Sequence, residues 1–355
     1  AAGPAFDREI APGLREVRVP KSREHDARER ELTPEVGVPI TDVLMPELAH
    51  LSPLYGEALA REAATAYRVV ACHPFLFPLL RGLGVPVWYE AQDLEWKLKQ
   101  SVLSGTATGD RLLASVRQVE GDCACAAELV ICASATDAAD LATIYGMAPT
   151  SIVIAPNGTD ASRITYTNHA ARTRVKTSMD LGMQRFVLFM GSGHWPNIEA
   201  VRRIFTMSAA APDVVFVIVG SVCYAFPPGG APPNVLMLGE VDDVTRNLAL
   251  EFCDVALNPM EHGTGTNLKM LDFLAAGIPV VATPIGARGI GVEDGVHARV
   301  VELADFVAAI YTLLGASAEE LDAMTRAARD LVEREFDWAA IGARMKQELA
   351  TRSVD

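Results

Sequence analysis

The stretch from Gly263 to Asp272 combines residue types that suit phosphate binding, and it leads into an apolar helical pattern. Glycines let a ligand approach the backbone closely, threonine hydroxyls add donors, and the free N–H groups at a helix start attract anions. Lys269 would add a positive charge in the first turn, where it opposes the helix dipole and favours a neighbouring anion. The alternative is an ordinary helix start with a tight turn. The residues of this predicted phosphate loop are Gly263, Thr264, Gly265, Thr266, Asn267 and Leu268.

Asp272 lies one helical turn beyond Lys269, so the two side chains would share one face of the predicted helix. A carboxylate at that place could accept hydrogen bonds from the paired hydroxyls of a ribose. The alternative is an ion pair with Lys269 that serves only the helix. Glu261 and His262 stand where they could touch a sugar, or they belong to a solvated loop. Phosphate and ribose together indicate a nucleotide ligand.

A second glycine pair follows the predicted strand "RFVLFMG" and comprises Gly191, Ser192 and Gly193. Pro196 stands where the third glycine of a dinucleotide fingerprint would be, and no acidic residue follows at the expected place. This argues against a nicotinamide dehydrogenase. The two glycines could still open a cleft for a sugar phosphate, and His194 would either contact that ligand or cap the following helix.

Alternating strands and helices would hold these residues in place. Buried strand patterns separated by helices begin at Val69, and a second such series begins at Arg185. Between them, the polar segment from Thr159 to Met183 is typical of an interdomain connection. Buried strands separated by helices predict parallel sheets, hence two doubly wound Rossmann-like domains with ligand at the carboxyl ends of their strands.

Composition limits the class of protein. The chain has 355 residues, of which 50% are hydrophobic, and a net charge of −14, which argues against nucleic acid as a partner. The mixed charges between Arg8 and Arg30 predict a solvated face or, alternatively, a weak membrane-surface patch. Apolar runs fall short of the roughly 18 residues of a membrane helix. The six scattered cysteines fit a reducing cytoplasm.

Several motifs together resemble a known family, the retaining glycosyltransferases of the large family 4, or glycosyl transferases group 1, which have the two-domain GT-B fold. "LKMLDFLAAGIPVVATPIGARGI" resembles the donor-binding helix and following strand of that family, and "FVLFMGSGHWPNIEAV" its first C-terminal strand and helix. "ICASATDAADLATIYGMAPTSIVIAPNGTD" resembles the end of the N-terminal domain, and "YEAQDLEWKLK" the segment facing the donor sugar. The resemblance covers nearly the whole chain.

The resemblance implies roles for particular residues. The family's ribose-binding glutamate matches Asp272, its other glutamate falls on Thr264, and its first-domain histidine corresponds to Gln92. "GTGTNLK" is similar to a variant of the family in which Asn267 replaces an arginine. The family pattern implies catalysis without a metal, in which Lys269 and nearby N–H groups stabilise the leaving diphosphate. Lys269 and Gln92 are the predicted catalytic residues.

The family pattern also implies an organisation of the chain. Residues 1–165 would form the acceptor-side domain, residues 180–335 the domain that binds the nucleotide sugar, and a closing helix at 336–352 would pack back on the first domain. "AAGPAFDREIAPGLREVRVPKS" resembles the middle of the family's N-terminal domain, so we expect the opening strand, its glycine-rich loop, the first helix and the next strand to be absent.

These expectations lead to one function and two alternatives. The leading hypothesis is a cytoplasmic, metal-independent, retaining hexosyltransferase without a cofactor, taking a UDP-sugar or GDP-sugar donor and a glycan or glycolipid acceptor in polysaccharide or glycoconjugate synthesis. One alternative is a degenerate protein of the same fold that binds a nucleotide sugar, or acts as a scaffold, without transfer. Another is a sugar-nucleotide epimerase, for which we identify no suitable set of acids and bases.

Overall fold

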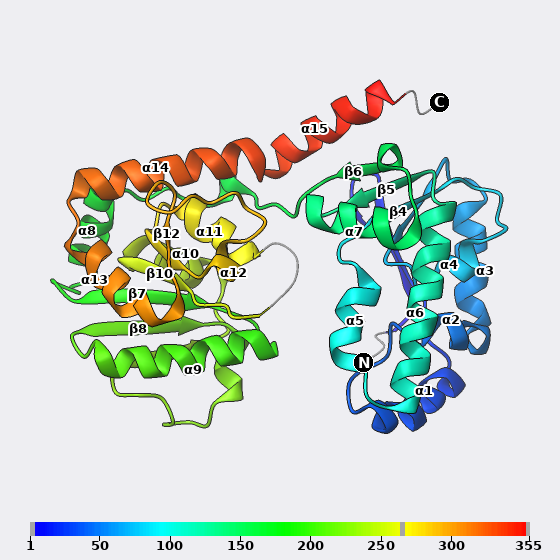
Figure 1. Ribbon diagram of the computed structural model, residues 1–355, viewed down its shortest axis with the longest axis horizontal. Coiled ribbons are helices and arrows are strands. Elements are labelled where there is room, and N and C mark those ends of the chain that lie inside the picture. The colour runs from blue at the N-terminus through cyan, green and yellow to red at the C-terminus, as the bar shows by residue number, and fades with distance from the viewer. Residues whose placement is uncertain (1–3, 263–266, 353–355) are drawn as a thin grey trace. The chain divides into compact units, whose positions relative to one another are not determined.

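The computed structural model of the protein describes residues 4–262 and 267–352. The chain divides into two compact units, Ala1–Ala155 and Pro156–Asp355, each with a parallel β-sheet of its own (Figure 1). The predicted α/β class with two Rossmann-like units is therefore confirmed. No described helix is both long and apolar enough to span a membrane.

The first unit has a four-stranded parallel sheet in the order β3-β4-β5-β6. The sequence patterns that begin at Val69 become these strands, as predicted. The strands are β3 (Val69–Cys72), β4 (Val87–Ala91), β5 (Leu129–Cys132) and β6 (Ile152–Ile154). The helices are α1 (Arg23–Val36), α2 (Met45–Leu48), α3 (Pro53–Ala63), α4 (Phe77–Leu80), α5 (Glu95–Leu103), α6 (Ala107–Ala126) and α7 (Ala135–Tyr145).

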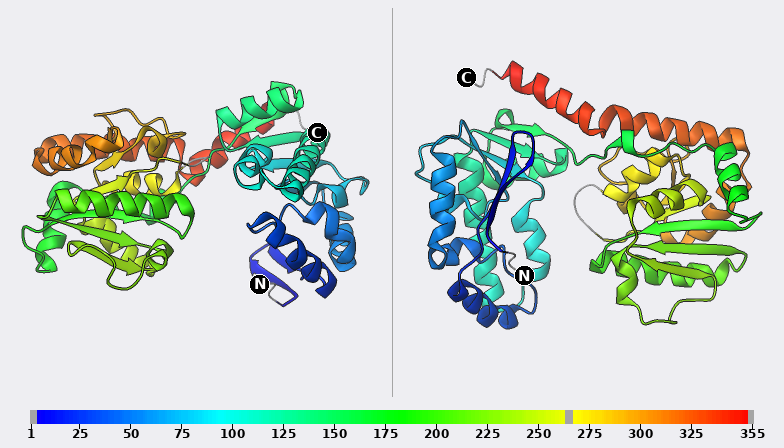
Figure 2. Two further views of the ribbon diagram at one scale, coloured as in Figure 1. Left: turned by 60° about the horizontal axis from the view of Figure 1, so that its bottom comes forward. Right: turned by 180° about the vertical axis from the view of Figure 1, so that it is seen from behind.

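An exposed antiparallel hairpin precedes this sheet, dark blue in Figure 2, and sequence analysis did not predict it. It consists of β1 (Phe6–Ala11) and β2 (Leu14–Arg18). Its charges are paired: Arg15 bonds to Asp7 across the hairpin and to Glu62 of α3. The choice between a solvated face and a weak membrane-surface patch stays a prediction.

The second unit has a six-stranded parallel sheet in the order β12-β11-β10-β7-β8-β9. The order reverses between β7 and β10, and the crevice at such a switch point is where doubly wound sheets bind ligands. The strands are β7 (Arg185–Met190), β8 (Val214–Val219), β9 (Val235–Gly239), β10 (Val255–Asn258), β11 (Val280–Ala282) and β12 (Arg299–Val300). The helices are α8 (His169–Ser178), α9 (Trp195–Ala210), α10 (Asp243–Phe252), α11 (Leu268–Ala276), α12 (Pro284–Ala287), α13 (Phe306–Gly315), α14 (Ala318–Glu335) and α15 (Trp338–Thr351).

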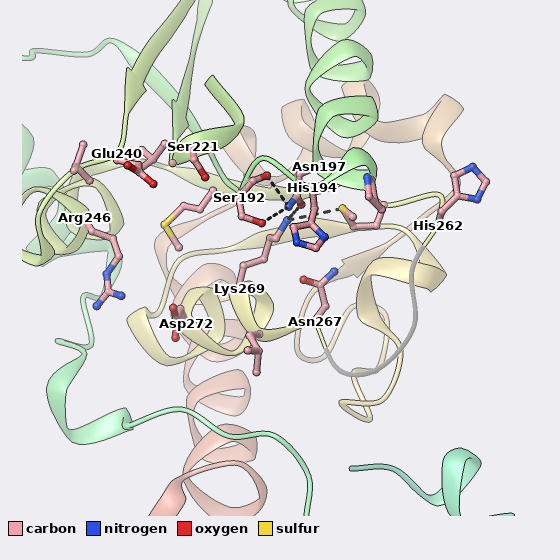
Figure 3. Close-up of a pocket in the computed structure, with 18 of the residues that line it drawn as sticks. Ser192, His194, Asn197, Ser221, Glu240, Arg246, His262, Asn267, Lys269 and Asp272 are labelled. Carbon is pink, nitrogen blue, oxygen red and sulfur yellow. Dashed lines mark hydrogen bonds between the residues drawn. The ribbon is translucent and has the colours of Figure 1, made fainter. Parts of the chain in front are cut away.

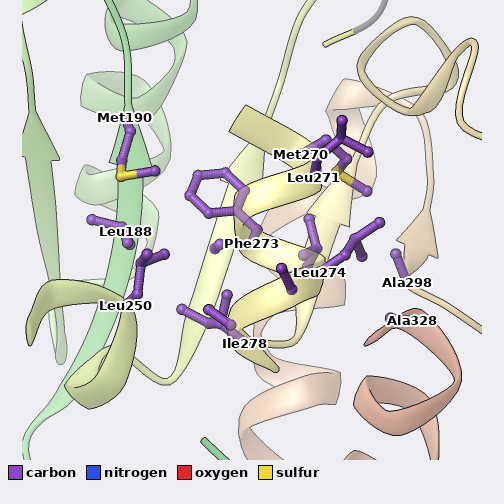
Figure 4. Close-up of a cluster of buried hydrophobic side chains, with 14 of the residues drawn as sticks. Leu188, Met190, Leu250, Met270, Leu271, Phe273, Leu274, Ile278, Ala298 and Ala328 are labelled. Carbon is purple, nitrogen blue, oxygen red and sulfur yellow. The ribbon is translucent and has the colours of Figure 1, made fainter. Parts of the chain in front are cut away.

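Helices cover both faces of this sheet, and alternating side chains of its strands serve two cores. Leu188 and Met190 of β7 pack with α11 and α14, whereas Val187 and Phe189 pack with α9 and α13 (Figures 1 and 4). Burial on both faces explains why β7 reads as a continuous apolar run instead of an alternating one. The rigid sheet fixes the ends of β7 and β10 at the switch point.

The polarity of the segment from Thr159 to Met183 suggested a simple connection, but the structure shows more than that. It contains α8, whose residue Arg172 is buried and donates to five backbone carbonyls at 2.5–3.1 Å. Three of these carbonyls end α10, at Leu250, Glu251 and Cys253. The sequence pattern of α8 is polar because the main buried residue of this helix is an arginine, which donates to the free carbonyls at the C-terminus of α10.

The end of the chain forms α15, within the second compact unit. Trp338 is the first residue of α15, and Asp337 is its N-cap. Just before this helix, the carbonyl of Phe336 accepts a hydrogen bond from Thr159 N at 2.9 Å. The predicted return of helix 336–352 to the first domain, and the predicted boundaries 1–165 and 180–335, stay predictions.

Candidate functional site

A pocket of about 1020 Å³ opens at the switch point of the second unit, and most of the predicted site residues line it (Figure 3). Its walls come from the loops after β7, β8, β9 and β10 and from α10 and α11. The lining residues are Met190, Gly191, Ser192, His194, Pro196, Asn197, Val219, Gly220, Ser221, Glu240, Val241, Arg246, Met260, His262, Asn267, Leu268, Lys269, Asp272 and Arg288.

The loop after β7 is shaped by close contacts with its neighbours. A Cβ on Gly191 would lie 3.0 Å from the Asn197 and Phe189 side chains, and one on Gly220 would lie 2.2 Å from the Gly191 carbonyl oxygen. Gly191 is therefore tightly packed against Asn197 and Phe189, and it also lines the pocket. Its predicted role in opening a cleft for a sugar phosphate stays a prediction. Gly193 has room for a Cβ, which would make an ordinary contact with Ser221 O at 3.7 Å.

Lys269, at the second position of α11, carries a desolvated ammonium group. Its Nζ donates to Asn197 Oδ1 at 2.5 Å and lies 4.4 Å from the centre of the Phe189 ring. Asn197 is itself held by its Nδ2, which donates to the Ser192 carbonyl at 3.0 Å. Among residues 4–262 and 267–352, Lys269 forms no ion pair. Burial lowers the pKa of this ammonium from 10.5 to about 7.

A buried ammonium without a carboxylate is costly unless a ligand supplies the negative charge. Residues 263–266 cannot supply it, because their sequence contains only glycine and threonine. The amide of Asn197 and the face of Phe189 hold the Lys269 side chain without neutralising it. A bound anion would therefore neutralise the charge of Lys269.

Asp272, one turn further along α11, is oriented by a residue far away in sequence. Thr159 Oγ1 donates to Asp272 Oδ1 at 2.8 Å. Burial raises the pKa of the Asp272 carboxyl, while this hydrogen bond and the positive charge of Arg246 oppose the rise. Asp272 makes no ion pair with Lys269 in the described part of the chain, so the interpretation in which the two only support the helix is wrong. The second oxygen of Asp272 remains able to accept from a ligand.

Arg246 and Glu240 line the pocket on the Asp272 side of Lys269, and sequence analysis missed both (Figure 3). The Nε of Arg246 is buried and has no hydrogen-bond partner among the described residues. The Arg246 Nη2 atom lies 3.3 Å from Asn247 Oδ1 and 3.7 Å from Asp243 Oδ1. A charged residue on the pocket-facing side of α10, just after the strand β9, was the available signal in the sequence.

The opposite side of the pocket carries His194, His262 and Asn267 (Figure 3). His194 occupies the N-cap position of α9, but its side chain makes no capping hydrogen bond. His262 packs against Trp195, with ring centres 5.4 Å apart. Glu261 does not line the pocket and pairs with Arg203, its Oε2 at 2.7 Å from Nε.

The predicted phosphate loop lies only partly within the described residues. Gly263, Thr264, Gly265 and Thr266 fall outside them. Asn267 is the N-cap of α11 without a side-chain capping bond, and its Nδ2 lies 3.3 Å from Asn258 Oδ1. Leu268 is 51% exposed and also lines the pocket. The described end of this loop therefore does face the predicted site.

Gln92 belongs to the first unit, where it follows β4 and is exposed. Its neighbours at the carboxyl ends of β3 and β4 include His73, which adopts φ 74° and bonds through Nδ1 to Glu95 Oε1 at 2.6 Å. Glu95 raises the pKa of the His73 imidazole by accepting this hydrogen bond. A catalytic role for Gln92 toward the ligand of the second unit stays a prediction.

Comparison with known proteins connects this pocket with sugar transfer. Residues 184–316 match the family model described as glycosyl transferases group 1. This segment is similar to group 1 glycosyl transferases. It contains every strand of the sheet in the second unit and the described walls of the pocket that are formed by α10 and α11.

Curated relatives align with larger parts of the chain. The D-inositol 3-phosphate glycosyltransferase of Geodermatophilus obscurus is 30% identical over 256 residues, which are 65% of this chain and 54% of that protein. The phosphatidyl-myo-inositol mannosyltransferase of Mycobacterium leprae is 26% identical over 125 residues, 35% of this chain and 33% of the relative. The chain thus spans about half, or less, of the length of these relatives.

Solved structures show the fold of the whole chain. Anabaena Alr3699/HepE in complex with UDP has a TM-score of 0.66 at 17% identity, with 86% of this chain and 84% of that chain covered. The sucrose-phosphate synthase of Thermosynechococcus elongatus has a TM-score of 0.71 at 17% identity, with 97% and 85% covered. The chain has the GT-B fold, as predicted.

Proposed function

We propose that this protein is a retaining, metal-independent glycosyltransferase that moves a hexosyl group from a UDP-sugar or GDP-sugar to a hydroxyl group of a glycan or glycolipid. The observation that carries the proposal is the ammonium of Lys269, which is desolvated in a large pocket and lacks a carboxylate partner in the described chain. The diphosphate of the donor would supply the missing negative charge.

The order of groups along the pocket matches the parts of a nucleotide sugar. The diphosphate would lie at Lys269 and the ribose hydroxyls at the free oxygen of Asp272. The base would lie at Arg246 and Glu240, further along in the same direction (Figure 3). The sugar then extends toward His194 and His262, on the other side of Lys269.

Arg246 supports uracil or guanine as the base. A guanidinium group can only donate hydrogen bonds, so it fits a base edge that presents a carbonyl oxygen. Uracil and guanine present such an oxygen, whereas adenine and cytosine present an amino group at the corresponding position. The Nε of Arg246, which has no hydrogen-bond partner among the described residues, could donate to such an oxygen.

In the reaction, the bond between the anomeric carbon and the diphosphate oxygen breaks, and its electron pair stays on the diphosphate. The acceptor hydroxyl oxygen bonds to the anomeric carbon on the face that the diphosphate leaves, and its proton passes to the departing diphosphate oxygen. The anomeric carbon passes through an oxocarbenium-like state while negative charge grows on the leaving group. Lys269, already held by Asn197, stabilises that charge without reorganisation. No metal ion is required for this role, which is why we propose metal independence. Gln92 would hydrogen-bond a hydroxyl of the transferred sugar.

The acceptor is proposed from the relatives. The names of both curated relatives describe transfer to inositol-containing molecules, one of them a phospholipid. A hydroxyl group of such a glycolipid, or of a growing glycan, would bring this protein to a membrane surface from the cytoplasm. Transfer there belongs to polysaccharide or glycoconjugate synthesis.

A calorimetric screen of UDP, GDP, CDP and ADP tests the donor assignment, and we expect only UDP or GDP to bind well. The matching nucleotide sugar is then incubated with myo-inositol, inositol 3-phosphate or vesicles containing phosphatidylinositol. Product mass and anomeric configuration report transfer and retention, and chelator should change neither. Failure to bind any nucleoside diphosphate would overturn the proposal, and a strict Mg²⁺ requirement would overturn its metal-free part.

The second candidate is a nucleotide-sugar-binding protein without transfer activity. Gln92 favours it, because an amide cannot titrate where the resembling family has a histidine. Tight donor binding with no transfer and no donor hydrolysis would support this candidate.

A further inference from the structure

An exposed aromatic pair stands at the end of the pocket that the nucleotide assignment leaves for the sugar. Trp195 is the first residue of α9 and is 56% exposed. Its ring centre lies 5.4 Å from that of His262, with an angle of 32° between the ring planes. His262 lines the pocket, whereas Trp195 adjoins the pocket only through its contact with His262.

The position of this pair follows from the residues between it and the base end. Figure 3 shows His262 and Arg246 at opposite sides of the pocket, with Lys269 between them. A diphosphate at Lys269 and a ribose at Asp272 direct the nucleoside away from His262. In a nucleotide sugar, the group on the other side of the diphosphate, here the side of His262, is the sugar ring.

The chemistry of the pair fits a pyranose ring. One face of a pyranose presents C–H groups, which can cover an indole ring and remove apolar area from water. A tilted imidazole beside the indole widens the aromatic surface and can donate or accept a hydrogen bond with a hydroxyl at the ring's edge.

We propose that Trp195 and His262 form a stacking platform for a pyranose ring next to the diphosphate site. The proposal rests on the proposed function, since that function fixes which side of Lys269 the sugar takes. The ring can come from the hexose of the donor or from a sugar of the acceptor, and both present the same C–H face.

Trp338 offers a matched control. It also begins a helix, α15, is 52% exposed and belongs to the same unit. Among the described residues its ring packs against no aromatic side chain of the pocket lining, whereas Trp195 packs against His262. Trp195→Ala and Trp338→Ala therefore remove the same exposed ring from two helix starts. Trp195→Phe keeps an aromatic face beside His262.

The experiment measures calorimetric binding of UDP and GDP, of UDP-glucose and GDP-mannose, and of methyl α-glucoside or methyl α-mannoside to nucleotide-saturated protein. We expect all variants to bind the nucleoside diphosphate equally. Trp195→Ala should weaken binding of a sugar-bearing probe by about tenfold. Trp338→Ala should not, and Trp195→Phe should retain most of the affinity. A loss with the nucleotide sugar assigns the platform to the donor, and a loss only with the methyl glycoside assigns it to the acceptor.

Indole fluorescence gives a second measurement of sugar binding that does not require a Trp→Ala variant. The sugar-bearing probe should change the emission of the Trp338→Phe protein but leave that of the Trp195→Phe protein unchanged. Equal affinity of wild type and Trp195→Ala for every sugar-bearing probe would overturn the platform while UDP or GDP still binds. Failure of wild type to bind UDP and GDP would overturn the proposed function and the platform together.

Discussion

Two cations of the second unit, the buried Arg172 and the half-buried Lys269, have opposite surroundings. Arg172 donates to five backbone carbonyls that end α10, precede α8 and follow α11, and burial lowers the pKa of its guanidinium to about 10. Lys269 has one amide oxygen, one thioether sulfur and one aromatic face, and burial lowers its pKa to about 7.

The difference separates a structural cation from a ligand-binding one. The donors of Arg172 are used inside the fold, so the free energy of its burial is recovered during folding. Lys269 is held in place but not neutralised, so part of its desolvation cost is recovered only when an anion binds. Desolvation lowers the pKa of both side chains, so the identity of their partners is what separates the two roles.

The largest expected effect is on stability, at Arg172. Arg172→Met leaves five carbonyls without their donor and should lower the free energy of unfolding of the second unit by about 3–5 kcal/mol. Urea unfolding measures this change. Arg174→Met is the matched control, because Arg174 lies exposed on the same helix and its loss should cost under about 0.5 kcal/mol. Equal stability of the two variants would show that Arg172 is not the structural cation.

The next largest effect is on nucleotide binding, at Asp272. Asp272→Asn should weaken UDP or GDP binding by about 1–3 kcal/mol, because an amide has one acceptor oxygen where the carboxylate uses one for Thr159 and offers the other to the ribose. Inorganic pyrophosphate should bind this variant as well as it binds wild type, since it has no ribose. Calorimetry with both probes decides the role, and parallel losses for nucleotide and pyrophosphate would remove Asp272 from the ribose site.

The pH dependence of binding tests the depressed pKa of Lys269. Below pH 7 the ammonium is already charged in the free protein, so Lys269 adds no pH dependence there. Above about 7, the free protein loses this proton and the diphosphate must restore it, so affinity should fall by up to about tenfold per pH unit. Lys269→Arg stays charged and should bind with a flat profile from pH 7 to 9. A flat wild-type profile with no proton uptake would contradict a neutral Lys269 in the free protein.

The smallest expected effect concerns base selection at Arg246. Arg246→Gln should reduce the preference for UDP or GDP over CDP and ADP by about tenfold, because a glutamine side chain both donates and accepts. Pyrophosphate binding should not change. Competition calorimetry with the four nucleotides measures the preference, and an unaltered order of affinities would place the base elsewhere.

Local patterns in the sequence predicted much of the fold. The alternating strands and helices from Val69 and from Arg185 were recognisable because buried parallel strands are continuous apolar runs. Lys269 and Asp272 were recognisable because they share one helix face beside a glycine-rich loop. Helix α8 was not, because its burial depends on Arg172, which a hydrophobic pattern does not register.

The remaining features depend on contacts between distant segments. Thr159 reaches Asp272 across 113 positions, and Asn197 reaches Lys269 across 72, so no window of sequence contains either pair. The close packing of Gly191 against Asn197 and Phe189 likewise becomes visible only in the structure. Arg246 became a candidate once its Nε was seen to be buried without a partner in the described chain.

The most direct test of the central claim compares nucleoside with nucleoside diphosphate at pH 6.5, where Lys269 carries its proton. Wild type should bind UDP or GDP about a hundredfold more tightly than uridine or guanosine. Lys269→Met should lose most of that difference in affinity and keep the affinity for the nucleoside. Its melting temperature should be no lower than that of wild type. Unchanged affinity for the diphosphate, or a large loss of stability as in Arg172→Met, would contradict the account and make Lys269 a second structural cation.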